Sequence, residues 1–148
     1  KTSDVARLRY EGCMLSFREH GIDFDPETDY QSIRFSFEEG YKATKKLLKN
    51  NKDYTAIFAV SDVMTIGAIR ALWEAGKKVP EDVSIITFNN SLYAQLASIE
   101  LTTVDINSFL LGQEAANQIL NHADNPNLTT TKTIVPHTII ERDSCRKI

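Results

Sequence analysis

Two short, largely apolar runs, at positions 56–60 and 83–88, are the clearest structural signal in the chain. Polar residues bound both runs. Strands that are buried on both faces show this pattern, and such strands are typical of parallel sheets covered by helices. We therefore expect both runs to be central strands of an α/β sheet.

The segment between these runs predicts a helix. Ser61 and Asp62 stand at its start as N-cap candidates, and Gly76 follows its end as a C′ residue. The positions expected on its buried side recur at helical spacing: Val63, Ile66, Ile69, Leu72 and Trp73. Strand, helix and strand with short connections form a βαβ unit, which is right-handed by strong precedent.

Two more helices are predicted before this unit. The first covers residues 4–21 and ends on a glycine, which readily adopts the left-handed conformation of a helix C-terminus. A polar, proline-containing stretch over residues 23–31 predicts a surface loop. The second helix covers residues 38–50, because Ser36 and Glu39 ahead of it have the spacing of a capping box.

The last third of the chain has a looser pattern. Residues 101–105 predict a short strand, and a helix that opens at Asn107 or Ser108 follows up to about residue 122. After the polar loop 124–132, residues 134–140 alternate loosely around a proline. A proline in such a run predicts an edge strand or a crossing between two sheets.

Composition narrows the class of protein. The chain has 148 residues, of which 42% are hydrophobic and 25% charged, and its formal net charge is −3. This balance is ordinary for a globular domain, and the length suits one domain or a fragment of a larger protein. No apolar run reaches the ~18–20 residues of a membrane span, and the mildly acidic balance argues against a nucleic-acid surface. Two cysteines without metal-ligand spacing predict a reduced, cytoplasmic protein with no metal site.

Polar side chains follow both central strands. Ser61 and Asp62 come directly after the first strand, and Asn89, Asn90 and Ser91 come after the second. In open α/β sheets, ligands bind beyond the carboxyl ends of the parallel strands. Short hydroxyl, amide and carboxylate groups there suit a neutral, hydroxyl-rich ligand. The same residue types also cap helices and turns, and position alone leaves both roles open.

Arg9 is the charge of most interest on the first helix, because it lies on or next to the face that carries Val5 and Leu8. An arginine there can present several fixed donors to ligand oxygens in a cleft. A surface salt bridge is the alternative role. The sequence holds no nucleophile elbow, zinc-protease motif or glycine-rich phosphate loop, so we expect neither enzymatic activity nor a cofactor.

Several motifs together resemble the lactose/galactose-repressor family. The stretch AIFAVSDVMTIGAIRALWEAGKKVPEDVSIITFNNS (56–91) resembles the family's strand, polar cap, A-x-G helix, G-x-x-V-P-x-D turn and second strand in order, with T-I-G at the place of A-x-G. LTTVDINSFLLGQEAANQIL (101–120) and VPHTIIERDSC (135–145) continue the resemblance. Upstream, ARLRYEGC (6–13) and FEEGYKAT (37–44) extend it. The resemblance therefore covers almost the whole chain at the family's spacings.

The resemblance implies a type I periplasmic-binding-protein-like α/β fold, with a parallel sheet flanked by helices in three αβα layers, of which this chain holds part of the core. Residues 1–104 would form most of the C-terminal subdomain. Residues 105–134 would cross to the N-terminal subdomain with a helix and a strand, and residues 135–148 would return. Family members are usually dimeric, cytoplasmic transcription regulators. The headpiece that binds operator DNA in the family would be absent from this chain.

The resemblance also implies effector-binding positions. They fall on five residues: Arg9, Phe35, Ser61, Asp62 and Asn89. Phe35 would stack on a sugar or base face. The sequence departs from the family at Ser61, where asparagine is usual, and at Asn89, where an amide that donates and accepts replaces a carboxylate. It departs again at Thr87, where glycine is usual. The turn 88–91, FNNS, is most similar to maltose-operon repressors of the family.

We therefore expect the C-terminal part of the effector-binding domain of a DNA-binding repressor. It would bind a small neutral sugar, with maltose as the candidate, in a cleft between two subdomains. A sugar-binding protein of a transport system has the same fold and is the alternative, and a fragment of a sugar-processing enzyme is a further one. By analogy with the family, Ile66, Ile69 and the loop 92–99 would form a homodimer contact, although core packing explains the two isoleucines equally well.

Overall fold

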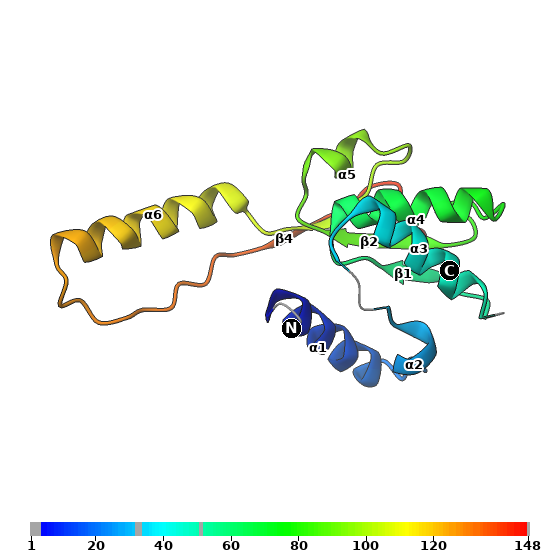
Figure 1. The fold of residues 1–148 in the computed structure, drawn as a ribbon, viewed down its shortest axis with the longest axis horizontal. Coiled ribbons are helices and arrows are strands. Elements are labelled where there is room, and N and C mark those ends of the chain that lie inside the picture. The colour runs from blue at the N-terminus through cyan, green and yellow to red at the C-terminus, as the bar shows by residue number, and fades with distance from the viewer. Residues whose placement is uncertain (1–3, 32–33, 51, 148) are drawn as a thin grey trace.

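The computed structural model describes residues 4–31, 34–50 and 52–147. Its centre is a four-stranded mixed sheet in the order β1-β2-β3-β4 (Figure 1). The parallel strands are β1 (Ala56–Phe58), β2 (Ser84–Phe88) and β3 (Thr102–Asp105), and β4 (Thr138–Ile140) pairs antiparallel with β3. Helices flank this sheet, as the sequence predicts, and the predicted strand at 134–140 is an edge strand that is shorter than expected.

Two helices, α3 (Phe37–Leu48) and α4 (Asp62–Glu74), pack against each other over the sheet. They cross closely because a glycine of each helix faces the backbone of the other. A Cβ atom at Gly40 would overlap a backbone oxygen of α4, and one at Gly67 would overlap a backbone oxygen of α3. The predicted cap of α3 is confirmed, since Ser36 Oγ accepts a hydrogen bond from the α3 backbone at 3.2 Å.

The buried face of α4 differs from the prediction. Its buried residues are mostly small, among them Gly67, Ala68 and Ala71, whereas Trp73 is 67% exposed. Only Leu72 of the five predicted core positions is fully buried; the three others besides Trp73 are half-buried. The close crossing with α3 explains the difference, because it admits only small side chains. Leu72 forms the core with two strand residues, Val83 and Ile85.

The burial of β1 also differs from the prediction. Ala56 is exposed and Ile57 and Phe58 are half-buried, so β1 is not covered on both faces. In the described sheet β1 is an edge strand with one neighbour, whereas β2 lies between two strands. Ile85 and Thr87 of β2 are accordingly inaccessible to solvent.

The N-terminal part contains one helix that the sequence analysis missed. The first helix, α1 (Asp4–Glu19), ends as predicted, with Gly21 at a φ of 63°. The expected loop 23–31 holds a short helix, α2 (Pro26–Asp29). Asp25 caps α2 by accepting a hydrogen bond from its backbone, and a proline begins it, which is a favoured arrangement for a helix start.

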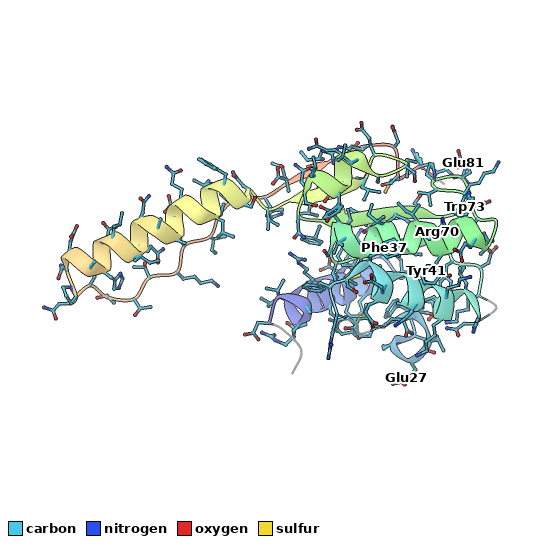
Figure 2. The ribbon with its side chains drawn as sticks, turned by 45° about the horizontal axis from the view of Figure 1, so that its top comes forward. Glu27, Phe37, Tyr41, Arg70, Trp73 and Glu81 are labelled. Carbon is cyan, nitrogen blue, oxygen red and sulfur yellow. The ribbon has the colours of Figure 1, made fainter. Side chains whose placement is uncertain are left out.

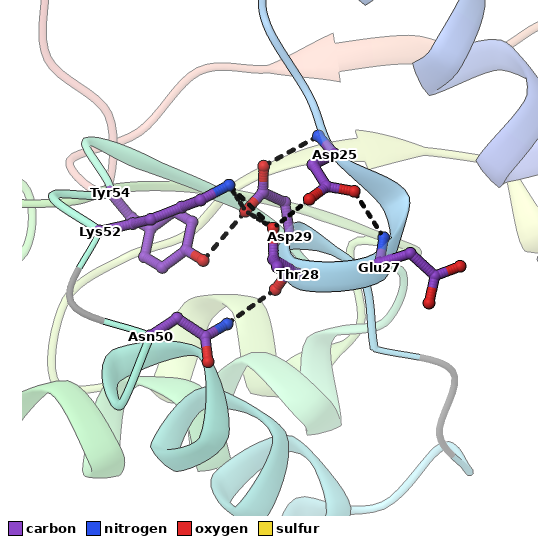
Figure 3. Close-up of polar contacts among 7 residues, drawn as sticks. All are labelled: Asp25, Glu27, Thr28, Asp29, Asn50, Lys52 and Tyr54. Carbon is purple, nitrogen blue, oxygen red and sulfur yellow. Dashed lines mark hydrogen bonds and ion pairs between the residues drawn. The ribbon is translucent and has the colours of Figure 1, made fainter.

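A polar network fastens α2 to the chain before β1 (Figure 3). Asp29 Oδ1 accepts from Lys52 Nζ at 2.7 Å and from Tyr54 Oη at 3.0 Å, and Asn50 Nδ2 donates to Thr28 O at 2.9 Å. Burial opposes ionisation of Asp29, but hydrogen bonds from Lys52, Thr28, Tyr54 and a backbone N–H outweigh it and lower the pKa of Asp29 to about 2.

After β2 the chain forms α5 (Leu92–Leu96), where we expected a loop, and after β3 it forms α6 (Ser108–Asp124), with Asn107 at its N-cap as predicted. Figure 1 shows α6 and the returning chain projecting away from the sheet. We call residues 106–137 the arm. Its assignment to an N-terminal subdomain stays a prediction. Within the described residues, none of the helices has the length and hydrophobicity that a bilayer crossing requires.

Candidate functional site

The polar residues after β1 and β2 lie together at the carboxyl edge of the sheet, as their positions predict. Asp62 Oδ2 accepts hydrogen bonds from the backbone N and the Oγ of Ser91, both at 2.7 Å. Asp62 Oδ1 accepts from Thr103 Oγ1 at 3.3 Å. One carboxylate therefore links the segments that follow β1 and β2 to β3.

The capping role expected for Asp62 is wrong. Ser61 occupies the N-cap position of α4, its side chain makes no capping hydrogen bond, and it is 6% exposed. Asp62 is the first helical residue and is 1% exposed, with both oxygens engaged by donors from other strand ends. Buried carboxylates are retained where such donors satisfy them. Direct contact of Ser61 or Asp62 with an effector stays a prediction.

Arg9 reaches this edge from α1. Its Nη1 donates to the carbonyl oxygen of Val60, its Nη2 donates to Asn89 Oδ1 at 3.2 Å, and its guanidinium lies 4.2 Å from the ring centre of Phe88. The alternative role, a surface ion pair, belongs instead to Arg7, whose Nη1 lies 2.8 Å from Glu11 Oε1. Arg9 is therefore placed against the ends of β1 and β2.

The electrostatics around Arg9 favour a polar ligand. Burial lowers the pKa of Arg9, and the nearby charge of Asp62 opposes that shift, so the guanidinium keeps its positive charge. A guanidinium has five N–H donors, and the two protein oxygens near Arg9 leave donors for a ligand. Asn89 adds an amide that can both donate and accept.

Phe88, which was not among the predicted site residues, places an aromatic ring beside Arg9. The Phe88 ring contacts Arg9 and packs edge-on against Phe58, with ring centres 5.6 Å apart. Phe35 lies on the segment before α3 and is 46% exposed, and its stacking role stays a prediction. The signal for Phe88 was present in its position, since it ends a parallel strand just before the polar turn.

Buried hydroxyl groups next to the site connect α4 to β2. Thr87, which departs from the family's glycine, is fully buried, and its Oγ1 lies 2.9 Å from Thr65 Oγ1. Sequence reasoning places Ser91 at this edge but misses Thr103, whose partner Asp62 is distant along the chain. The backbone at Asn89 has a φ of 105°, a conformation that asparagine tolerates better than most residues.

Comparisons with known proteins agree with this architecture. A family model described as a periplasmic binding protein-like domain matches residues 1–145. The HTH-type transcriptional repressor PurR of Pasteurella multocida is 37% identical over 114 residues, which cover 77% of this chain and 34% of the relative. The chain thus spans about a third of the length of that curated relative.

Solved structures give the same result. A complex of the transcriptional regulator CelR with cellobiose matches with a TM-score of 0.87 and 27% identity, covering 92% of this chain and 41% of the other. A LacI family transcriptional regulator from Enterococcus faecium with bound ribose matches with a TM-score of 0.82 and 31% identity, covering 93% and 50%. This chain therefore belongs to the periplasmic binding protein-like domain family and corresponds to part of the effector-binding domain of lactose-repressor-type transcription regulators.

Proposed function

We propose that the chain is the C-terminal part of the effector-binding domain of a cytoplasmic, DNA-binding transcriptional repressor that is not an enzyme. Its effector is a small neutral sugar, with maltose as the candidate. The observation that carries this proposal is the placement of Arg9 against Asn89 and Phe88 at the carboxyl ends of β1 and β2. The cellobiose and ribose complexes among the similar structures support a sugar.

The chemistry of the site suits such a ligand. Sugar hydroxyl oxygens accept from the Arg9 guanidinium, and the Asn89 amide both donates to and accepts from hydroxyl groups. The Phe88 ring beside them offers an apolar surface to the C–H side of a sugar ring. The second wall of the cleft comes from parts of the protein outside this chain, and operator DNA is bound by a separate headpiece.

Regulation follows from a difference in affinity. A sugar that binds one arrangement of the two subdomains better than the other shifts the population toward it and changes operator affinity. Coupling of this kind is typically about 1–3 kcal/mol. The sign of the response decides whether the sugar acts as inducer or co-repressor.

Thermal unfolding of the full-length protein with maltose, cellobiose and ribose tests the effector. A ligand that binds only the native state raises its stability by mass action. We expect one of these sugars to raise the melting temperature in a concentration-dependent way. If cellobiose or ribose shifts the melting temperature and maltose does not, maltose is rejected as the effector but a sugar effector is kept. If no neutral sugar shifts it, the proposal of a sugar effector is rejected.

Arg9→Ala and Arg7→Ala form a matched pair for the site, since both arginines lie on α1 but only Arg9 contacts the sheet edge. Losing a charged hydrogen-bond partner in the site costs about 1.5–3 kcal/mol, which is roughly a 10- to 150-fold weaker sugar affinity. We expect Arg9→Ala to abolish the operator response while leaving basal operator binding intact, and Arg7→Ala to behave as wild type. A normal response in Arg9→Ala would contradict its role. Sugar binding by a full-length protein that binds no operator would favour a transport protein.

The partner in this proposal is a second copy of the chain. An apolar patch on α3, α4 and α5, which we call the dimer patch, surrounds a hollow of about 530 Å³. Figure 2 shows Phe37, Arg70 and Trp73 on the outer side of the helix pair. The large apolar members of the patch are Phe37, Ile66, Ile69, Trp73, Tyr93 and Leu96. Ile69 also packs against the core, so the two interpretations of this residue are compatible.

Trp73→Ala tests the dimer patch. Tryptophan residues often dominate interface energies, and Trp73 is 67% exposed in this chain. We expect the full-length variant to sediment as a monomer at concentrations where the wild type is a dimer. Glu27→Ala, on α2 away from the dimer patch, is the control and should sediment as the wild type. If Trp73→Ala remained a dimer, the dimer patch would not be the interface.

A further inference from the structure

Asn90 joins two distant segments through its side-chain amide. Its Nδ2 donates to Asp105 Oδ2 at 3.1 Å, and its Oδ1 accepts from Arg142 Nη2 at 2.8 Å. Its backbone N–H donates to Thr103 Oγ1 at 3.2 Å. One neutral amide thus bridges an acid and a base that stand 37 positions apart in the numbering of the chain, 105 and 142. We call these three side chains the Asn90 bridge.

The Asn90 bridge lies at the root of the arm. Asp105 ends β3, and its other oxygen accepts at 2.7 Å from the backbone N–H of Asn107, the N-cap of α6. Arg142 follows β4, its side chain is only 13% exposed, and its Nη1 donates to Leu101 O at 2.8 Å. The bridge therefore ties together the segment that leaves for the arm and the segment that returns from it.

The same turn connects the Asn90 bridge to the candidate effector site. Asn89 and Asn90 are consecutive and both have left-handed backbone, with φ values of 105° and 51°. Asn89 Oδ1 accepts from Arg9, and Asn89 N donates to the carbonyl oxygen of Val104 at 3.0 Å, one residue before Asp105. Because Asn89 and Asn90 are adjacent in one turn, a movement of Asn89 also displaces Asn90.

We infer that Asn90 is a positioning residue that couples the effector site to the arm. Together with the β3–β4 pairing, its amide holds Asp105 and Arg142 in one relative position, and occupation of the site beside Asn89 changes the orientation of the arm through that amide. This inference rests on the proposed function, and it adds a residue that does not itself touch the sugar. Coupling between sites requires such an element with two arrangements that both sites bias.

Asn90→Gly in the full-length protein separates the amide from the backbone. Glycine adopts a φ of 51° without strain, so the turn is kept while both bonds of the bridge are lost. We expect the dissociation constant for the sugar to stay within about threefold of the wild type. The sugar-induced change in operator affinity, typically about 5- to 150-fold for such coupling, should shrink to about twofold or less.

Asn107→Gly is the matched control. Asn107 is also a left-handed asparagine, with a φ of 49°, on the same crossing segment, but its side chain caps α6 at Leu110 N and takes no part in the bridge. Glycine replaces a capping asparagine with much less loss of helix stability than alanine does. This variant should keep the wild-type operator response.

Hydrogen exchange in the same full-length proteins gives a readout that needs no sugar. Asn90→Gly should speed amide exchange at residues 102–105 and 138–142, and Asn107→Gly should not. A wild-type operator response in Asn90→Gly would overturn the coupling role, and loss of sugar binding itself would make Asn90 a binding residue instead. If the wild type responds to no sugar, the proposed function fails, and unchanged exchange in Asn90→Gly would additionally show that the amide does not hold the arm.

Discussion

Two helices of comparable length, α4 and α6, have opposite surroundings in this chain. α4 has seven buried residues, including Gly67 and Leu72. α6 has none, and even its large apolar residues Phe109 and Leu120 are 83% and 62% exposed. Both helices carry apolar side chains at helical spacing, so the sequence pattern predicts both equally well. The pattern says that a helix has an apolar face, but it does not say whether the partner of that face lies in the same chain.

Because of this difference, the sheet and the arm should contribute unequally to the folding stability of the chain. The sheet with α3 and α4 contains the buried core, and the arm with α6 is attached at its root by the pairing of β3 with β4 and by the Asn90 bridge. Burial of apolar area is the main favourable term in folding. The stability of the isolated chain should therefore depend on the sheet and hardly on the arm, and paired substitutions can test this.

Leu72→Ala and Leu120→Ala should show the largest contrast. Leu72 is fully buried, and truncating a buried leucine costs about 2–5 kcal/mol, whereas exposed positions usually change stability by about 0.5 kcal/mol or less. Urea unfolding of the isolated chain measures both values. Similar losses for the two variants would contradict the division. If the proposed N-terminal subdomain covers α6, Leu120→Ala should cost more in the full-length protein than in the isolated chain.

Gly67→Ala and Gly112→Ala should differ in sign. A methyl group at Gly67 overlaps the α3 backbone, and overpacking of this kind costs about 1–3 kcal/mol. A methyl group at Gly112 in α6 meets no atom within 4 Å, and alanine favours a helix over glycine by up to about 1 kcal/mol. Circular dichroism melts of the isolated chain compare the two. A stabilised Gly67→Ala variant would show that the helices can separate without cost.

Local signals explain which parts of the fold could be predicted. The cap of α3 depends on Ser36 and Glu39, three residues apart. The positions of both strands follow from short apolar runs, although β1 ends at Phe58, two residues before its run does. The meeting of Asp62 with Ser91 also follows from a general rule, because adjacent parallel strands end at the same edge. Trp73 was misplaced, because helical spacing alone does not show that α3 approaches α4 through glycines.

The site was predictable in place but not in detail. Asn89 and Arg9 were expected at the sheet edge and contact each other there. The partner of Thr103 is 41 positions away, and the bond of Asn90 to Arg142 spans 52, so no local pattern carries either contact. Such pairs depend on the register of β3 with its neighbours, which the sequence of one segment does not contain.

The smallest expected effect concerns α2. Like α6, this helix has no buried residues. Unlike α6, it is held by hydrogen bonds to the segment before β1. Asp29 has a folded-state pKa of about 2, below its ordinary 3.8. A depressed carboxyl pKa stabilises the fold above the unfolded pKa, and that contribution is lost as the pH falls from about 4 toward 2. Asp29→Asn should therefore unfold at lower urea than the wild type at pH 7 and show a flatter loss of stability between pH 4 and pH 2.

Glu74 limits how flat that profile becomes. Hydrogen bonds from Tyr41, Arg70 and Lys45 also lower its pKa to about 2, so it titrates over the same pH range. Glu74→Gln is therefore the control, and a residual slope in Asp29→Asn should disappear in the double variant. If Asp29→Asn kept the full wild-type slope, the polar network would not fasten α2, and a segment without buried residues would be as loosely held there as it is in the arm.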